Sequence, residues 1–270
     1  MKQRLITAAL IIAVALPIII MGGLPILVLG SLLTLVAVWE LIAMRGTKNP
    51  APIEVKALVY AATLWVVFHD FNFGGSLGMG IGALSLEVVA GFLLLLLVVV
   101  VFRQEFKVSD AAFYLMTILY VGTTFRSMLF LRQPNLTLFI FMILVVAITD
   151  AMAYFVGRKF GKHKLAPLVS PKKTVEGAIG GTLGGIVAGT VYGLVTGMPT
   201  SVGILIFLSL IAAIVGQIGD LMASSMKREY GIKDFGKIFP GHGGVLDRLD
   251  SHLFASLVLY LVINLFNVVV

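Results

Sequence analysis

The chain contains no cysteine, and only 12% of its 270 residues are charged. Without cysteine it can form no disulfide and no cysteine-based zinc or redox site. Soluble domains have about a quarter of their residues charged, so this chain does not have the composition of one. A Gly-x-x-x-x-Gly-Lys-Ser/Thr phosphate loop is also absent, so nothing indicates a P-loop nucleotide site. What remains is mainly apolar, with 59% hydrophobic residues.

Nine apolar segments follow one another, each long enough or nearly long enough to cross a hydrocarbon core of ~30 Å. They cover residues 5–20, 24–44, 54–69, 86–102, 111–130, 136–156, 174–196, 202–224 and 250–269. The pattern predicts an all-α, polytopic integral membrane protein with about nine transmembrane helices in a single membrane domain. The first segment can also be interpreted as a signal peptide, although it ends in a poor cleavage site. The glycine-rich residues 70–85 are expected to form a short external or re-entrant connection.

The basic residues predict the orientation. With the N-terminus in the cytoplasm, the inside connections carry 18 of the 20 lysines and arginines, and only Arg126 and Arg132 fall outside. This asymmetry is what the positive-inside rule expects. It also explains the net charge of +7 better than nucleic-acid binding does, because basic residues in so apolar a chain suit anionic lipid headgroups. The polar stretches 157–173 and 225–249 are then both cytoplasmic.

Residues 224–250, SSMKREYGIKDFGKIFPGHGGVLDRLD, carry the densest chemistry of the chain. Basic residues open the stretch, a glycine-rich turn follows, and aspartates close it. If a helix starts near its end, Asp247 and Asp250 share one face because they are three residues apart. Carboxylates, cationic donors and glycine amides crowded at a membrane surface suit a metal ion and phosphates.

This stretch closely resembles the signature of the phosphatidate cytidylyltransferases, the CDP-diacylglycerol synthases. The matching residues are Ser225, Lys227, Arg228, Lys233, Asp234, Pro240, His242, Gly243, Gly244, Asp247, Arg248 and Asp250. The resemblance extends upstream through Asp150 and residues 170–177, and it thins toward the N-terminus. The CDP-alcohol phosphotransferases carry Asp-Gly-x-x-Ala-Arg instead, whereas Asp220 is followed here by Leu-Met-Ala-Ser. The chain therefore resembles an enzyme that makes a CDP-activated lipid rather than one that consumes it.

Acidic residues inside apolar segments are further candidates, because a charge in lipid is costly. Asp220 lies seven residues before Lys227, roughly 10 Å below it along a helix. It can simply pair with a nearby lysine or arginine, or it can join Asp247 and Asp250 around Mg²⁺, which takes one or two carboxylates plus waters and phosphates. Asp150 is either a helix-packing contact or a functional group. Glu40 and Glu87 stand alone, and we interpret both as structural.

A second candidate region is Ser170-Pro171-Lys172-Lys173-Thr174-Val175-Glu176-Gly177. Ser170 is expected to cap a helix, with Thr174 as the alternative cap. The two lysines would then meet the positive end of that helix and bind anions, or else serve only as membrane anchors. Beyond them, glycines recur at every fourth position from Gly177 to Gly189, a small-residue stripe for close packing within one protomer or in a homodimer.

The resemblance implies a cytidylyltransferase that condenses CTP with phosphatidic acid to give CDP-diacylglycerol and pyrophosphate. It implies a scaffold in about residues 1–110 and catalysis in about 111–270, at the cytoplasmic face of a bacterial-type inner membrane. Mg²⁺ is the expected cofactor, held by Asp220 and Asp247, and a second cation is left open. The catalytic candidates are Asp220, Asp247, Lys227, Arg228 and Asp250. The substrate-binding candidates are Lys172, Lys173, Asp150, Ser225, Lys233, His242, Gly243, Gly244 and Arg248. A CTP-dependent polyprenol or other lipid kinase and a secondary transporter remain the alternatives.

Overall fold

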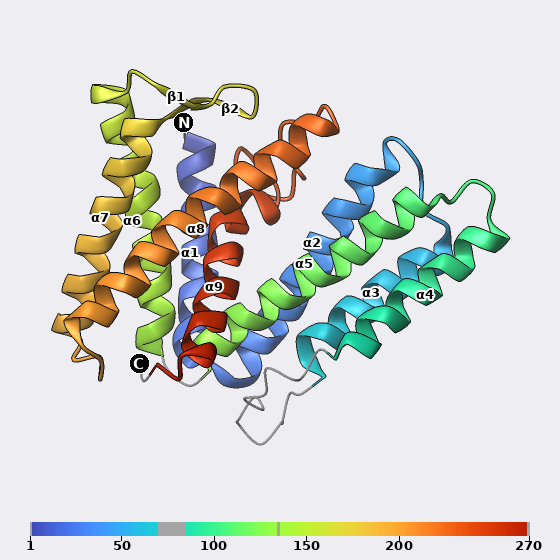
Figure 1. Ribbon diagram of the computed structural model, residues 1–270, viewed down its shortest axis with the longest axis horizontal. Helices are drawn as coiled ribbons and strands as arrows, with labels where there is room; N and C mark the ends of the chain where they lie inside the picture. Colours follow the sequence, from blue (N-terminus) through green and yellow to red (C-terminus); the bar gives the residue numbers. More distant parts are fainter. Residues whose placement is uncertain (1, 70–84, 134–135, 269–270) are drawn as a thin grey trace. The chain divides into compact units, whose positions relative to one another are not determined.

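The computed structural model describes residues 2–69, 85–133 and 136–268 and is almost entirely helical (Figure 1). Its helices are α1 (Lys2–Met21), α2 (Gly23–Gly46), α3 (Ile53–Phe68), α4 (Leu86–Phe102), α5 (Val108–Arg132), α6 (Leu136–Phe160), α7 (Val175–Val195), α8 (Val202–Glu229) and α9 (Leu246–Leu265). Its strands are β1 (Lys164–Ala166) and β2 (Ser170–Thr174). The glycine-rich connection predicted at 70–85 lies, apart from Ser85, outside the described residues.

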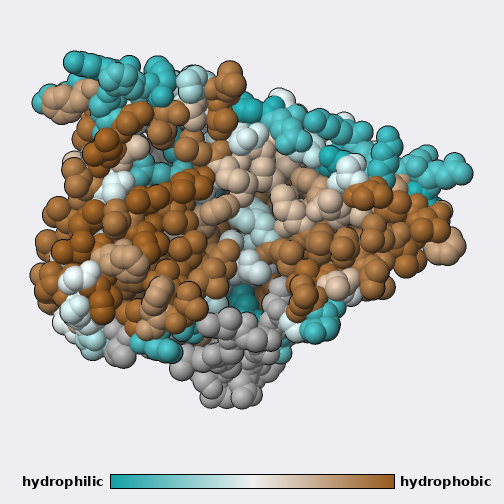
Figure 2. All heavy atoms as spheres, viewed as in Figure 1, coloured by the Kyte–Doolittle hydropathy of each residue, from teal (hydrophilic) through white to brown (hydrophobic). Residues whose placement is uncertain are grey.

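The helices of the described residues coincide with the nine predicted apolar segments, which confirms a polytopic membrane fold. Five of them, α2, α5, α6, α7 and α8, are long and apolar enough to cross a membrane. Shorter apolar helices are α4 and the Ala9–Met21 part of α1. Figure 2 shows apolar atoms along the flanks of the helices and hydrophilic atoms gathered near helix ends. The number of spans itself stays a prediction.

The chain divides into two compact units. Unit 1 comprises Met1–Gln133 and Asp234–Asp247, and unit 2 comprises Pro134–Lys233 and Arg248–Val270. The signature stretch is therefore split between them: its basic half belongs to unit 2 and its glycine-rich turn to unit 1. The expected division into a scaffold up to about residue 110 and a catalytic part beyond it stays a prediction.

Unit 1 is held by buried polar contacts as well as by apolar packing. Arg45 donates to the carboxylate of Asp110, which is 1% exposed, and Asn49 donates to the same carboxylate over 2.7 Å. Arg132 donates to the carbonyl oxygens of Ile19 and Ile20, which have no intrahelical partner because they lie in the last turn of α1. The arginine that the charge pattern assigned to an outside connection therefore closes a helix terminus.

Unit 2 is organised by the glycine stripe of α7, which is buried along its length and runs beside α6 (Figure 1). An added Cβ at Gly181 would lie 2.7 Å from the carbonyl oxygen of Thr149 on α6. Toward the end of α7, the stripe also meets Ser209 and Leu205 of α8. These glycines are thus occupied by packing inside the protomer, and the homodimer stays a prediction.

Replacing Gly181 by valine is expected to lower the thermal unfolding midpoint, because overpacking a close helix contact costs about 1–3 kcal/mol. Gly91 provides a matched control, since it lies within apolar α4 and an added Cβ there would meet nothing within 4 Å. Thermal unfolding of both valine variants in detergent measures the difference. Equal midpoints for the two variants would contradict the close packing of α6 on α7.

The region before α7 differs from the sequence prediction. Ser170 does not cap a helix, because Ser170–Thr174 forms β2 and pairs antiparallel with β1. The alternative cap is confirmed: the hydroxyl of Thr174 accepts a hydrogen bond from the Gly177 amide over 3.1 Å. The two lysines therefore lie on a strand just before the helix. A hairpin was not foreseen, because its pairing depends on contacts between separate segments.

Candidate active site

Three aspartates from different helices of unit 2 lie close enough for their charges to interact: Asp150 on α6, Asp220 on α8 and Asp250 on α9. Helices α8 and α9 approach closely here, since an added Cβ at Gly219 would lie 2.8 Å from the Asp250 carbonyl oxygen. Ser251 binds one of the acids: its amide and its hydroxyl donate to the Asp250 carboxylate over 2.7 and 3.4 Å.

Two lysines lie among these acids. The Lys173 ammonium of β2 forms an ion pair with the Asp220 carboxylate at 2.5 Å. Its positive charge also attracts the Asp150 carboxylate. Lys227, on α8, is only 8% exposed, and its positive charge attracts the Asp250 carboxylate. Ser224 donates to the other Asp220 oxygen over 3.3 Å, one helical turn away. Unit 2 thus gathers three carboxylates and two ammonium groups.

Asp220 therefore forms an ion pair, as one of the two predicted alternatives has it. Its partner is Lys173, which was predicted to bind a substrate phosphate. The hairpin that carries Lys173 is fastened to α7. The Glu176 carboxylate accepts from the Lys162 amide over 3.0 Å and from the His163 ring over 2.6 Å. The first lysine of the pair, Lys172, is exposed. Only one lysine of the pair consequently reaches the acidic cluster.

The glycine-rich turn belongs to unit 1. Phe239 and Gly243 exchange backbone hydrogen bonds of 2.9 and 3.1 Å and close a tight loop. Gly243 has φ +89°, a backbone conformation that residues other than glycine rarely adopt. His242 is half-buried, and its Nδ1 atom has no hydrogen-bond partner among the described residues. The turn therefore presents one imidazole nitrogen, while the amides of His242 and Gly243 both donate to the Phe239 carbonyl oxygen.

Asp247 closes the loop that contains this turn. Its Oδ2 atom accepts hydrogen bonds from the Phe235 amide over 2.7 Å and from the Gly244 amide over 2.9 Å. The helix expected near the end of the stretch is confirmed, because α9 starts at Leu246 and contains both Asp247 and Asp250. Asp247 belongs to unit 1, and within unit 2 the structure brings Asp220 together with Asp150 and Asp250.

The remaining candidates lie on the surface. Arg228, in the last turn of α8, donates to the Ile232 carbonyl oxygen over 3.0 Å. The exposed candidates are Ser225, Arg228, Lys233 and Arg248 together with Lys172. Gln217, one turn before Asp220 on α8, donates to the Thr182 hydroxyl on α7 over 3.0 Å.

Oxygen atoms of the chemical type that binds Mg²⁺ are present in unit 2. Across residues 2–69, 85–133 and 136–268, no group of three or more histidine, aspartate or glutamate side chains lies close enough to hold a metal ion. Mg²⁺ usually takes one or two protein carboxylates and completes its shell with waters and substrate phosphates. The carboxylate and hydroxyl oxygens of Asp220 and Ser224 are of the right chemical type. The metal roles of Asp220 and Asp247 stay predictions.

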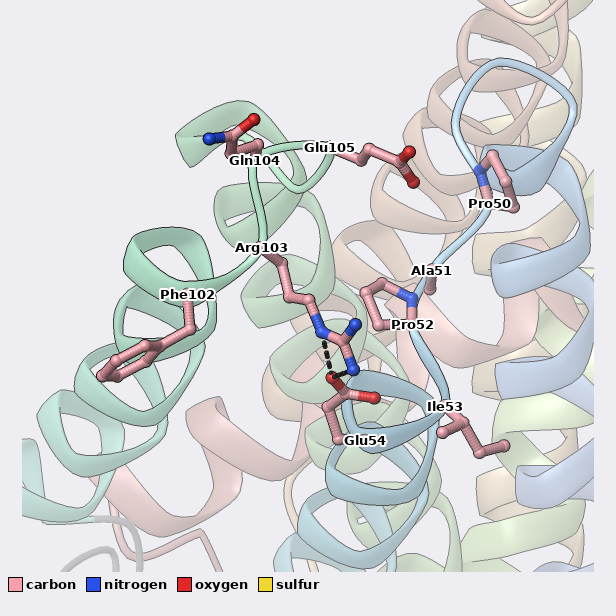
Figure 3. Close-up of a pocket in the computed structure, with 9 residues that line it drawn as sticks. All are labelled: Pro50, Ala51, Pro52, Ile53, Glu54, Phe102, Arg103, Gln104 and Glu105. Atoms are coloured by element: carbon pink, nitrogen blue, oxygen red, sulfur yellow. Dashed lines mark hydrogen bonds and ion pairs between the residues drawn. The ribbon is translucent and has the colours of Figure 1, made fainter.

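A surface hollow in unit 1 contains none of these candidates (Figure 3). It is lined by Pro50, Ala51, Pro52, Ile53, Glu54, Phe102, Arg103, Gln104 and Glu105. Two of its charged side chains, Arg103 and Glu54, form an ion pair at 2.7 Å. None of its lining residues was predicted as a site residue.

Comparison with known proteins agrees with the signature residues. The model of the cytidylyltransferase family matches residues 2–266. The chain belongs to the cytidylyltransferase family. It is similar to phosphatidate cytidylyltransferases of Staphylococcus haemolyticus, at 36% identity, and of Staphylococcus saprophyticus and Staphylococcus aureus, each at 35%. Each alignment covers 255 residues, 94% of this chain and 95% of the relative.

For this member of the cytidylyltransferase family, sequence reasoning missed two residues of the candidate site. Ser251 donates two hydrogen bonds to the Asp250 carboxylate, but a serine next to a signature aspartate carries no signal of its own. Glu40 was interpreted as structural, and it is bound to the signature loop: its carboxylate accepts from the Val245 and Leu246 amides over 2.8 and 2.9 Å. A lone acid within an apolar helix was the available signal.

Proposed function

We propose that the chain catalyses the condensation of CTP with phosphatidic acid to CDP-diacylglycerol and pyrophosphate. The family and the named relatives support this activity. Within the structure, the observation that carries it is the group of Asp150, Asp220 and Asp250 beside Lys173 and Lys227. Such a group suits two polyanionic substrates, because lysines neutralise phosphate charge and carboxylates suit a metal that does the same.

In this reaction a phosphate oxygen of the lipid attacks the α-phosphorus of CTP, and pyrophosphate leaves. The second pKa of a phosphate monoester is near 6, so the nucleophile is mostly ionised at neutral pH and needs little help from a base. Catalysis then depends on neutralising charge and on holding the two phosphates in line. Lys173 and Lys227 are placed to bind phosphate oxygens. Lys173 would exchange its partner Asp220 for a phosphate as the substrates enter.

Mg²⁺ is proposed as the cofactor, with Asp220 and Asp247 each contributing a carboxylate. Bound there, the ion would neutralise phosphate charge and orient the pyrophosphate leaving group. The residues of the chain would keep distinct tasks: Ser224 orients the Asp220 carboxylate, and Lys227 balances Asp250. His242, Gly243 and Gly244 would shape the pocket for the triphosphate.

Labelled CTP tests the activity directly. With purified protein, phosphatidic acid and Mg²⁺ in detergent micelles, label on the α-phosphate of CTP is expected in the lipid product. A CTP-dependent lipid kinase would instead transfer label from the γ-phosphate, and a transporter would transfer neither. Lipid labelled only from the γ-position would overturn the proposed activity.

The basic residues of 170–177 and of 225–249 are expected to affect different kinetic constants. Lys173→Ala should mainly raise the KM for CTP, while Arg228→Ala should lower kcat with both substrates saturating, because interactions formed mainly in the transition state appear in kcat. Lys162→Ala is the matched control on the exposed end of the hairpin. Steady-state kinetics with each substrate varied in turn measures the effects. If Lys173→Ala raises only the KM for phosphatidic acid, the nucleotide assignment is wrong.

We propose a location in the bacterial cytoplasmic membrane, with the N-terminus and the two long polar stretches inside. The absence of cysteine makes this testable by single substitutions at exposed positions. Cysteines at His163 and Lys237 should resist an impermeant maleimide in sealed cells, whereas a cysteine at Thr196 should react. Labelling of the first two positions without the third would reverse the proposed orientation. Permeabilised cells, in which all three should react, provide the control.

A further inference from the structure

Glu40 makes contacts that its position in an apolar helix does not explain. The side chain is fully buried, and both carboxylate oxygens accept backbone hydrogen bonds, Oε1 from Val245 and Oε2 from Leu246. These amides lie at the start of α9, where N–H groups have no partner within the helix and carry partial positive charge. A residue more than 200 positions away in sequence thus completes the start of α9.

The loop is shaped around this carboxylate. An added Cβ at Gly236 would lie 2.5 Å from Oε1 of Glu40, and one at Gly244 would come still closer to the same atom. Both ends of the loop therefore contact a single carboxylate, and both are glycines because the approach leaves no room for a side chain. Simple capping of a helix would involve only the second end.

Glu40 and Asp247 together hold four backbone amides of the loop, one at Phe235 and three in succession from Gly244 to Leu246. Asp247 holds the amides of Phe235 and Gly244, and Glu40 holds those of Val245 and Leu246. Between these anchors lies the turn with His242 and Gly243. Within the turn, the Thr7 hydroxyl donates to the Pro240 carbonyl oxygen over 3.1 Å, and this contact is exposed, unlike the buried anchors at Glu40 and Asp247.

We propose that Glu40 is a positioning residue that fixes the conformation of residues 236–246, and thereby the pocket for the CTP triphosphate. The proposal rests on the function proposed above, in which this turn binds CTP. Glu40 touches no substrate in this proposal. Its effect passes through the backbone amides that it orients, so its loss should weaken CTP use before it affects the use of phosphatidic acid.

The test uses the full-length protein in detergent with the variants Glu40→Gln and Glu40→Asp. Glutamine retains the size but presents an amide NH₂ group to one of the two backbone donors, and aspartate retains the charge but has a shorter reach. Glu87→Gln, at the exposed start of α4, is the matched control. The measurements are amide hydrogen exchange of peptides covering 236–246, the thermal unfolding midpoint, and kcat and KM for each substrate.

We expect Glu40→Gln to speed exchange within 236–246 and to lower kcat/KM for CTP by about 10- to 100-fold, the factor expected for one lost hydrogen bond to a charged group. The KM for phosphatidic acid should change less than about twofold, and Glu40→Asp should restore part of the CTP effect. Normal exchange and normal kinetics in Glu40→Gln would overturn the proposal. Equal losses toward both substrates with a lowered midpoint would also overturn it, because they indicate a purely structural role.

Failure of the proposed function would look different. If the unmodified protein transferred no cytidylyl group from CTP, the activity assignment would fail, yet hydrogen exchange would still report whether Glu40 fixes the loop. If the unmodified protein were active and Glu40→Gln behaved like Glu87→Gln, only the positioning role would fail.

Discussion

Asp220→Asn is expected to lower turnover by about 100-fold or more while the protein stays folded. Asparagine retains the shape of the side chain and can still accept the hydrogen bond from Ser224, but it removes the charge that pairs with Lys173. Loss of a charged group that supports a metal and phosphates costs several kcal/mol of transition-state stabilisation. Because the Asp220 side chain is partly exposed, its ion pair with Lys173 contributes little to folding.

The measurement is kcat at saturating CTP and phosphatidic acid, together with the thermal unfolding midpoint. Glu229→Gln is the control, since it removes an exposed carboxylate from the end of the same helix. Asp220→Cys adds a test of metal contact: in a chain without other cysteines, Cd²⁺ should restore some activity, because thiolates favour soft metals. Near-normal turnover of Asp220→Asn would remove this residue from the site.

The apolar segments of the sequence predicted the helices well, because burying or lipid-exposing some 20 apolar residues leaves few alternatives to a helix. The start of α9 at the signature aspartates and the cap at Thr174 could also be anticipated from local chemistry. Helix ends were less accurate. Helices α6 and α8 continue to Phe160 and Glu229, so the basic residues expected in loops lie on helical turns.

The partners of individual charges could not be predicted, because they depend on which helices meet. The sequence pointed to Asp220 as a metal ligand or as half of an ion pair, and the structure pairs it with Lys173 from a hairpin that no local pattern indicated. It pointed to Glu40 only as an isolated acid. The contact with the Val245 and Leu246 amides joins segments about 200 residues apart, and nothing in either segment alone predicts it.

The glycine stripe of α7 illustrates the same limit. Its four-residue spacing predicted close helix packing, and that is confirmed by burial of every glycine from Gly177 to Gly193 in the series. The spacing could not say whether the second helix belongs to the same protomer. The Thr149 carbonyl oxygen, 2.7 Å from where a Gly181 Cβ would lie, shows that α6 fills this role.

Asp247→Asn is expected to lower turnover by about 100-fold or more, but by a route that differs from that of Glu40→Gln. The single carbonyl oxygen of asparagine can replace Oδ2 and still accept the Phe235 and Gly244 amides, so the loop keeps its anchors while the charge is lost. Asp247→Ala removes both the negative charge and the acceptor that anchors the loop.

Hydrogen exchange across 235–244 should therefore be normal in Asp247→Asn and faster in Asp247→Ala, with turnover lost in both. Glu105→Gln, which removes an exposed carboxylate from unit 1, should change neither measurement. Glu40→Gln should show the opposite combination, with a loosened loop, a raised KM for CTP and measurable turnover at saturation. Near-normal turnover of Asp247→Asn would contradict a charged role for Asp247 and would leave it as a second anchor of the loop beside Glu40.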